Sequence, residues 1–371
     1  MNIACDARAL AGPLTGVGRW TAHVMGGLAR RFGARILLAS PRPLTIPDDL
    51  DLPSVRALTP PRVRVPGTLW LHTALPRRLE RTPAEAFVAA LAVVPRRCPI
   101  PAVAVVHDLT PRTHPARHTL ANRFCFNAYL EESLDRAAAV VAVSRATADR
   151  LLALAPGVRD RLTVISNGVD VRFSPAGDDD GSTVRRRFSN GRPFVLHLGT
   201  LEPRKGLTDL VAAWEQLHDL VAEAPDLVLA GAAGWAFAPL GRRIESSPLR
   251  DRIHLPGYVS DDDARGLLQH AEVFVAASEE EGFGLPLAEA LCSGAACITT
   301  DAPALVETAG GAALHVPVND PSALARALAS ALEPEANAEL RRRALARAPE
   351  LRWAPAVEAW FRLLQKVIGE G

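Results

Sequence analysis

The sequence has 371 residues, which is more than one ordinary domain needs and enough for two. Hydrophobic residues make up 48% of it and charged residues 22%, which suits two packed cores and lies near the globular norm. The formal net charge is +1, so bulk electrostatic binding of nucleic acid is not expected.

The sequence also bears on the cellular compartment. Met1 leads directly into a strand-like run instead of a signal peptide, and no apolar stretch reaches the length of a membrane span. The cysteines form no Cys-x-x-Cys pair and lie mostly in apolar runs, as small core residues do in a reducing compartment. We therefore expect a cytoplasmic protein. The cysteines are Cys5, Cys98, Cys125, Cys292 and Cys297.

Short apolar runs alternate with helical patterns in the first half of the chain. A loop at residues 12–18 precedes a helix predicted from about Arg19 to Arg31, and residues 40–66 suggest loops around one weak strand. Further helices are predicted at Thr119–Arg136 and Thr147–Leu154. This alternation predicts a parallel, doubly wound sheet. The apolar runs are Ile3–Asp6, Ile36–Ala39, Phe87–Val94, Ala102–His107, Ala138–Val143 and Leu162–Ile165.

The alternation restarts after a polar, turn-rich stretch at 174–191, which we interpret as a linker. A helix is predicted at Leu207–Leu220, and the tail is helical from Pro321. The predicted fold is therefore α/β, with Rossmann-like domains at 1–173 and 192–354 facing a ligand cleft. A helix at about 355–371 is expected to pack back on the first domain. The strands expected in the second domain are Phe194–Leu198, Leu227–Ala230, Ile253–Leu255, Val273–Ala277, Ala296–Thr300 and Ala313–Val316.

The most informative stretch runs from Val273 to Ala290 and reads VFVAASEEEGFGLPLAEA. It combines a buried strand, an acidic glycine-bearing loop and a helix opened by Pro286. Bare backbone amides at such a helix start favour a phosphate, whereas the carboxylates of the loop repel phosphate and suit hydroxyl groups. A ligand that is half diphosphate and half polyol is a nucleotide-sugar, which is our predicted ligand.

Glycines and polar residues gather directly after the expected strands, where ligands bind to open α/β sheets. Lys205 is one of two lysines in a chain that otherwise uses arginine, the other being Lys366. The candidates of the first domain are Asp6, Arg8, Gly16, Gly18, His107, Asp108, Asn167 and Gly168. Those of the second are Glu202, Arg204, Lys205, Gly231, Tyr258 and the stretch Glu281–Glu289.

Together these motifs resemble the retaining glycosyltransferases of family 4, which have two Rossmann-like domains in the GT-B architecture. The most specific element is Glu-x7-Glu, met by Glu281 and Glu289 in EGFGLPLAEAL. GPLTGVGRW, VVHDL, SNGVD, HLGTLEPRKG, LAGAAGW and LPGYVSDDD follow in the order of the family, so the resemblance covers nearly the whole chain. HLGTLEPRKG and GPLTGVGRW are most similar to members that use GDP-mannose in polysaccharide assembly.

The resemblance implies a role for each matching residue. Glu289 would bind the donor ribose, Glu281 would lie against the donor sugar, and His107 would face that sugar from the first domain. Many members carry an arginine where this chain has Thr200 after Gly199, so Arg204 is the residue expected to supply that charge. Arg204 and Lys205 would neutralise the diphosphate. The loop Gly282-Phe283-Gly284 would lie beside it, and Gly284 and the following Leu285 would offer it amides. Tyr258 and Val259 would line the base, and Gly16 and Gly18 would approach the phosphate.

The expected chemistry agrees with these roles, because a leaving nucleoside diphosphate can be stabilised by arginine, lysine and helix amides. No Asp-x-Asp or His-rich cluster follows a strand, and Asp261–Asp263 are better interpreted as an N-cap run. We therefore expect no metal and no cofactor, with a GDP- or UDP-sugar as substrate. The resemblance, and not the spacing, implies retention of configuration by front-face attack.

Structural interpretations stay open beside these. Glu281 could belong to a solvated acidic loop, and His107 could be a polar cap at a strand end. Glu289 could be a carboxylate near a helix start, where a negative charge is ordinarily favourable. Gly16 to Gly18 and Asn167-Gly168 could be turns, and Ser144 an N-cap. Five arginines suit either a solvated surface or a peripheral contact with an anionic membrane or the acceptor: Arg77, Arg78, Arg81, Arg96 and Arg97.

The predicted activity is a hexosyltransferase that acts on a saccharide, a lipid-linked or a small-molecule acceptor. One alternative is a nucleotide-sugar epimerase with the same paired domains, which needs an acid and a base around the sugar. Another is a dinucleotide oxidoreductase, although neither domain has a tight Gly-x-Gly-x-x-Gly after its first strand.

Overall fold

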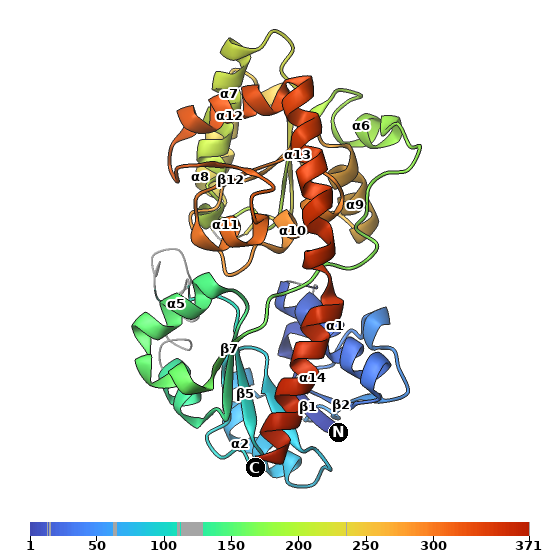
Figure 1. Cartoon of the computed structure of the whole chain (residues 1–371), viewed down its shortest axis with the longest axis vertical. Coiled ribbons are helices and arrows are strands. Elements are labelled where there is room, and N and C mark those ends of the chain that lie inside the picture. The colour runs from blue at the N-terminus through green and yellow to red at the C-terminus, as the bar shows by residue number, and fades with distance from the viewer. Residues whose placement is uncertain are drawn as a thin grey trace. The chain divides into compact units, whose positions relative to one another are not determined.

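The computed structural model describes residues 1–12, 14, 16–61, 65–109, 112, 129–234 and 236–370. The chain divides into two compact units (Figure 1). The first comprises Met1–Gly168 together with Trp353–Gly371, and the second comprises Val169–Arg352. Each unit contains a parallel sheet with helices between its strands, so the predicted α/β class with two doubly wound domains is confirmed.

The sheet of the first unit has seven strands in the order β3-β2-β1-β4-β5-β6-β7. The strand order reverses between β1 and β4, since the chain adds β2 and β3 on one side and all later strands on the other. The central strands are apolar and fully buried, as expected for a sheet covered on both faces. The strands are β1 (Asn2–Asp6), β2 (Arg35–Ala39), β3 (Val55–Ala57), β4 (Ala86–Ala89), β5 (Ala102–Val106), β6 (Ala139–Ala142) and β7 (Leu162–Val164).

Helices cover both faces of this sheet. Trp70 and Leu75 of α2 share one core with Phe87 of β4 and with Leu134, which lies in the helical residues 129–136. The helices α1 and α14 contact each other and contribute no residue to this core. The helical segments are η1 (Arg8–Leu10), α1 (Gly16–Phe32), η2 (Asp48–Leu50), α2 (Gly67–Leu79), α5 (Arg145–Leu154), η4 (Pro156–Arg161) and α14 (Trp353–Gly369).

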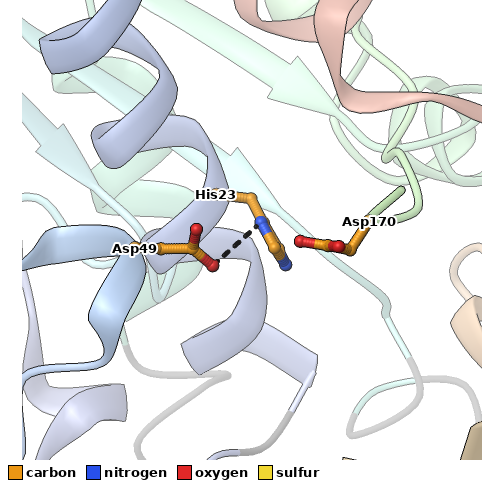
Figure 2. Close-up of side chains that lie close together, drawn as sticks. All are labelled: His23, Asp49 and Asp170. Atoms are coloured by element: carbon orange, nitrogen blue, oxygen red, sulfur yellow. Dashed lines mark ion pairs between the residues drawn. The ribbon is translucent and has the colours of Figure 1, made fainter. Parts of the chain in front are cut away.

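The helix α14 joins the first unit although it follows the whole second unit in sequence, and Figure 1 shows it in red beside the blue α1. Trp360 is completely buried and meets Trp20 edge-on, with ring centroids 5.4 Å apart. Phe361 stacks on Phe32 at 3.9 Å. His23 of α1 stacks on Trp353 and pairs with Asp49, whose carboxylate lies 3.3 Å from its Nδ1 (Figure 2). Aromatic packing therefore holds α14 on α1.

The sheet of the second unit has six strands in the order β10-β9-β8-β11-β12-β13. Here the strand order reverses between β8 and β11. All pairings are parallel, and β8, β9, β11 and β12 are buried along their whole length. The strands are β8 (Phe194–Leu198), β9 (Asp226–Ala230), β10 (Ile253–Gly257), β11 (Val273–Ala276), β12 (Cys297–Thr300) and β13 (Leu314–Val316).

One core of the second unit lies between the sheet and the helices α7, α8 and α12. Alternate residues of the strands, such as Val273 and Val275 of β11, point to it and meet Trp214 of α7. The helix α10 contacts both α9 and α13. The helical segments are α6 (Ser182–Phe188), η5 (Pro203–Lys205), α7 (Leu207–Leu220), α8 (Ala238–Glu245), η6 (Arg250–Arg252), α9 (Asp261–His270), α10 (Leu285–Cys292), α11 (Pro303–Ala309), α12 (Pro321–Leu332), α13 (Pro334–Arg347) and η7 (Ala348–Leu351).

Three expectations differ from the structure. Residues 182–188 of the expected linker form α6, which contacts α9 and belongs to the second unit. The first helix begins at Gly16 and not near Arg19, so Gly16 and Gly18 lie in its first turn and not in a loop. The helix α2 was not expected, because Pro76 interrupts its pattern. Of the helix expected at 119–136, only residues 129–136 are described, and they are helical.

Among the described residues, no helix has both the length and the apolar character needed to cross a membrane. The contact considered between the arginine cluster and an anionic membrane or the acceptor stays a prediction.

Replacing Trp360 by Ala should destabilise the first unit by about 3 to 5 kcal/mol, because it leaves a large cavity between α1 and α14. Urea denaturation followed by far-UV circular dichroism measures the loss. The matched control is Gln365→Ala on the exposed side of the same helix, which should change stability by less than about 0.5 kcal/mol. Equal effects of the two changes would show that α14 does not stabilise the unit through this contact.

Candidate active site

The candidate site of the second unit lies where the strand order of its sheet reverses. The ladder between β8 and β11 comprises only the pairs Val195–Val273 and Leu196–Phe274, so the two strands are no longer paired towards their carboxyl ends. Ligands of open α/β sheets bind in the crevice at such a point. The loops after β8, β9, β10 and β11 carry the predicted donor-site residues, and these strands are neighbours in the sheet.

Backbone hydrogen bonds tie the first three of these loops together. The amide of Gly199 donates to Ala230, and the amide of Gly231 donates to Gly257, at 2.9 and 2.8 Å. Gly231 has φ +153°, and a Cβ atom there would lie 1.8 Å from the carbonyl oxygen of Gly199. Only glycine fits this approach. Packing thus explains Gly231, and the role predicted for Gly199 and Gly231 in donor binding stays a prediction.

A short turn delivers Lys205 to the loop after β11. The turn η5 ends at Lys205 and is followed by its C-cap residue Gly206, which has φ +61°. A Cβ at Gly206 would lie 2.1 Å from the carbonyl oxygen of Ala277, so the absence of a side chain lets the turn press against the end of β11. The amide of Glu279 donates to the carbonyl of Arg204 at 2.9 Å and fixes the same contact.

Glu281 is the centre of the polar cluster that results. Lys205 Nζ donates to its Oε1, Arg204 Nη1 donates to its Oε2 at 3.0 Å, and Ser278 Oγ donates to Oε1 at 2.8 Å. Lys205 is 7% exposed and Glu281 is 9% exposed, so this ion pair is nearly withdrawn from water. Arg204 also donates to Glu202 at 2.5 Å. The alternative that Glu281 belongs to a solvated acidic loop is therefore wrong.

The pKa values of Glu281 and Lys205 are both lowered in this cluster. Burial opposes the ionisation of Glu281, but the charges of Lys205 and Arg204 and the hydrogen bonds outweigh it and lower the pKa of Glu281 to about 2. Burial, followed by the neighbouring charge of Arg204, lowers the pKa of Lys205 below its usual 10.5, and Glu281 opposes this shift. The carboxylate is thus ionised throughout the physiological range.

The loop 282–285 leads into α10, whose N-cap residue is Gly284 with φ +89°. Because glycine carries no capping side chain, it leaves the first amides of α10 uncapped, and such amides favour anions. Thr308 Oγ1 donates to the carbonyl of Phe283 at 2.6 Å, and the Phe283 side chain is buried. This places Gly284 and Leu285 as predicted, at a helix start beside Glu281.

The remaining donor-site candidates of this unit differ in exposure. Glu289 is 7% exposed and lies in the second half of α10, away from the helix start where a carboxylate is ordinarily favourable. After β10, Tyr258 is 62% exposed whereas Val259 is buried. An exposed aromatic ring beside the crevice suits a base, but these ligand roles stay predictions.

The sequence analysis missed His197, a buried residue within the apolar run of β8. It lines a pocket together with Lys205, Ser278, Glu281 and Gly284, among other residues. Its position inside a strand hid it, because every candidate was sought after a strand. Its place two residues before Gly199 in HLGT was the available signal.

In the first unit, His107 follows β5 and is partly buried. Its Nε2 lies 3.0 Å from the carbonyl oxygen of Ala90, and its ring meets Trp20 edge-on. Burial lowers the pKa of His107 to about 4, so the ring is neutral at physiological pH. Asp6 is fully buried and pairs with Arg8 through two contacts of 2.9 and 2.7 Å. The catalytic role predicted for His107 stays a prediction.

Several structural interpretations can now be judged. Ser144 is the N-cap of α5 and accepts from the amide of Thr147, as expected. The residues Asp261–Asp263 form the first turn of α9, whereas the capping side chain belongs to Ser260. Cys292 and Cys297 are core residues, and Cys125 lies outside the described residues.

Replacing Glu281 by Gln should destabilise the second unit by about 3 to 5 kcal/mol at neutral pH, because Lys205 stays buried without its counter-charge. The folded pKa of about 2 lies below the ordinary value of 4.5. The carboxylate therefore contributes stability above pH 4.5 that is lost as the pH falls through about 2. Urea denaturation at several pH values should show the deficit of the variant shrinking in that window.

The control for this prediction is the double variant Lys205→Met with Glu281→Gln, which should recover most of the lost stability because no buried charge of the pair remains. A double variant as unstable as Glu281→Gln alone would show that the unpaired lysine is not the cause.

Comparisons with known proteins agree with this geometry. A model of Glycosyltransferase Family 4 matches residues 14–173, and a model of Glycosyl transferases group 1 matches residues 182–350. The O-antigen chain mannosyltransferase B of Escherichia coli is 28% identical over 254 residues, which are 68% of this chain and 67% of that protein. The serotype-specific mannosyltransferase WbdA of the same organism is 30% identical over 279 residues, or 71% of this chain. Those residues are 34% of WbdA, so the chain spans about a third of that relative.

Solved structures share the fold over nearly the whole chain. The Anabaena protein Alr3699/HepE, solved in complex with UDP and glucose, has a TM-score of 0.76 at 19% identity, covering 98% of this chain and 99% of that one. A glycosyltransferase from Rickettsia africae ESF-5 has a TM-score of 0.76 at 17% identity, covering 100% and 99%. The comparisons do not favour an epimerase or an oxidoreductase. With a matching model in each half and the GT-B fold throughout, the chain belongs to the family 4, or group 1, glycosyltransferases.

Proposed function

We propose that the chain transfers a hexose, mannose in the first instance, from a nucleoside diphosphate to a saccharide or lipid-linked saccharide, with retention of configuration and without a metal ion. The observation that carries the proposal is the buried contact of Lys205 and Arg204 with Glu281 at the point where the strand order reverses. This contact places two cations, which can bind a diphosphate, beside a carboxylate, which can accept hydrogen bonds from sugar hydroxyls.

Lys205 has donors beyond its contact with Glu281. An ammonium group has three N–H donors, and the hydrogen bond to Glu281 uses one of them. A diphosphate bound beside the start of α10 accepts from Lys205 and from the amides of Gly284 and Leu285, with the charge of Arg204 close by. Glu281 is then released in part to accept hydrogen bonds from sugar hydroxyls.

The same groups support the bond-breaking step. When the anomeric C–O bond breaks, negative charge develops on the leaving phosphate, and preorganised cations and amides stabilise it without reorganisation. Two fixed cations can neutralise this charge, which is why we propose a reaction that continues in the presence of a chelator. Retention of configuration rests on family membership, as do the roles proposed for His107 and Glu289.

The donor and the acceptor are proposed from the relatives. Two of them, at 28% and 30% identity, are named as mannosyltransferases, and one of these acts on an O-antigen chain by its name. GDP-mannose and a growing saccharide are therefore the first substrates to test. UDP-sugars belong beside them, because HepE was solved with UDP and glucose.

Thermal unfolding in the presence of EDTA should show stabilisation by one nucleotide-sugar and its nucleoside diphosphate. A ligand at a hundred times its Kd adds about 2.7 kcal/mol to the free energy of unfolding, which shifts the melting temperature measurably. GDP-mannose, GDP, UDP-glucose, UDP and NADH form the panel. Stabilisation by NADH alone, or only after a divalent metal is added, contradicts the proposal. Conversion of a bound nucleotide-sugar to its epimer without any acceptor would instead indicate an epimerase.

Replacing Lys205 by Met should lower kcat for hexose transfer about a hundredfold, because the leaving phosphate loses one of its cations. Lys366, which is the other lysine and lies exposed on α14, offers the matched control. Lys366→Met should retain the wild-type kcat. Circular dichroism establishes that both variants are folded at the assay temperature, and a Lys205→Met variant with wild-type kcat would contradict the proposed role.

A further inference from the structure

His197 presents an unpaired ring nitrogen to the candidate site. Its side chain is 2% exposed, and its Nδ1 lies 3.2 Å from the carbonyl oxygen of Val275 in the neighbouring strand β11. Its Nε2 is buried and has no hydrogen-bond partner within the part of the chain that the structure describes. Buried polar atoms are nearly always paired, so this nitrogen calls for an occupant that the protein itself does not supply.

The contact to Val275 determines which ring nitrogen carries the proton. A carbonyl oxygen can only accept, so Nδ1 must be the N–H donor. Burial, together with the nearby charge of Lys205, lowers the pKa of His197 to about 4 and keeps the ring neutral at physiological pH. In this tautomer Nε2 carries a lone pair and no proton. It is therefore a hydrogen-bond acceptor.

The surroundings of this acceptor limit what can occupy it. The pocket that His197 lines also contains Lys205, Ser278, Glu281 and the helix start at Gly284. A phosphate oxygen has no proton to give and is repelled by the lone pair. The hydroxyl groups of a sugar are donors, and Glu281 on the same pocket wall accepts from the same kind of group. The chemistry thus selects the sugar part of a nucleotide-sugar over its diphosphate.

We propose that His197 Nε2 accepts a hydrogen bond from a hydroxyl group of the transferred hexose, which makes His197 a specificity determinant of the donor site. This inference rests on the proposed function. A site that holds a buried acceptor for one hydroxyl rejects an analogue lacking that hydroxyl, because the acceptor is then buried without a partner. His197 therefore distinguishes a hexose from the corresponding deoxy sugar.

Two variants separate this role from the structural bond to Val275. His197→Asn keeps a short amide N–H in place of Nδ1–H, able to donate to Val275, but removes the acceptor. His197→Gln extends its amide to the place of Nε2, keeps an acceptor there and loses the bond to Val275. Isothermal titration of wild type and both variants with GDP, GDP-mannose, UDP and UDP-glucose measures the consequences.

The expected result is a loss confined to the sugar. His197→Asn should bind the nucleoside diphosphate as the wild type does and its nucleotide-sugar about tenfold more weakly, whereas His197→Gln should retain most of the affinity for the nucleotide-sugar. Titration with deoxy-hexose analogues then identifies the hydroxyl, because wild type and His197→Asn should bind the analogue that lacks it equally well.

Other outcomes overturn the inference. Equal weakening of nucleoside diphosphate and nucleotide-sugar binding by His197→Asn would mean that His197 only positions Lys205 or the strands. Unchanged binding of both ligands would mean that a water molecule fills the pocket. In either case the proposed function stands. A wild type that binds none of the four ligands would remove the proposed function as well as the inference.

Discussion

The buried contact of Glu281 with Lys205 and Arg204 is the constraint on which the candidate site depends. Withdrawing such charges from water costs several kcal/mol per ion, and only close, hydrogen-bonded geometry recovers that cost. The turn at Gly206, pressed onto the end of β11, and the hydroxyl of Ser278 supply this geometry. The positions of the loops after β8 and β11 are therefore tied to the contacts of Glu281 with Lys205 and Arg204.

The same constraint prepares the site for a charged ligand. Lys205 is buried and both cations are held in place by Glu281, so a bound diphosphate meets donors that need little rearrangement. Glu281 pairs with both cations and Glu202 pairs with Arg204, so two carboxylates balance the two positive charges. His197 adds a neutral acceptor to this otherwise charged pocket, and its neutrality follows from burial beside Lys205.

The sequence predicted much of the fold because its strands are continuous apolar runs and its main helices have a clear period. The bounds of α7, Leu207–Leu220, agree with the helix predicted around these residues. The helix α2 contains Pro76, which interrupts its pattern, and α6 lies in the polar, turn-rich stretch 174–191 that the sequence indicates as a linker. Local composition predicts a helix poorly where tertiary packing, and not intrinsic propensity, stabilises it.

Within the site, spacing revealed Glu281 and the loop around it, but it could not reveal their partners. Lys205 and Glu281 are 76 positions apart, and only the parallel pairing of β8 with β11 brings them together. The proton position on His197 depends on the carbonyl of Val275, which is 78 positions away. Contacts between residues so far apart in sequence depend on the order of the strands in the sheet, and the pattern of a single apolar run does not indicate that order.

The return of α14 to the first unit has a consequence for synthesis. The first unit is encoded in two pieces, and the ribosome delivers the second piece only after all of residues 169–352. Domains generally fold as units during translation, with the amino-terminal one first. Here the nascent second unit has its complete sheet before the first unit has Trp360, so the apolar surface of α1 that Trp360 covers stays bare until α14 leaves the ribosome. During that interval the nascent chain exposes apolar surface of the kind that promotes aggregation.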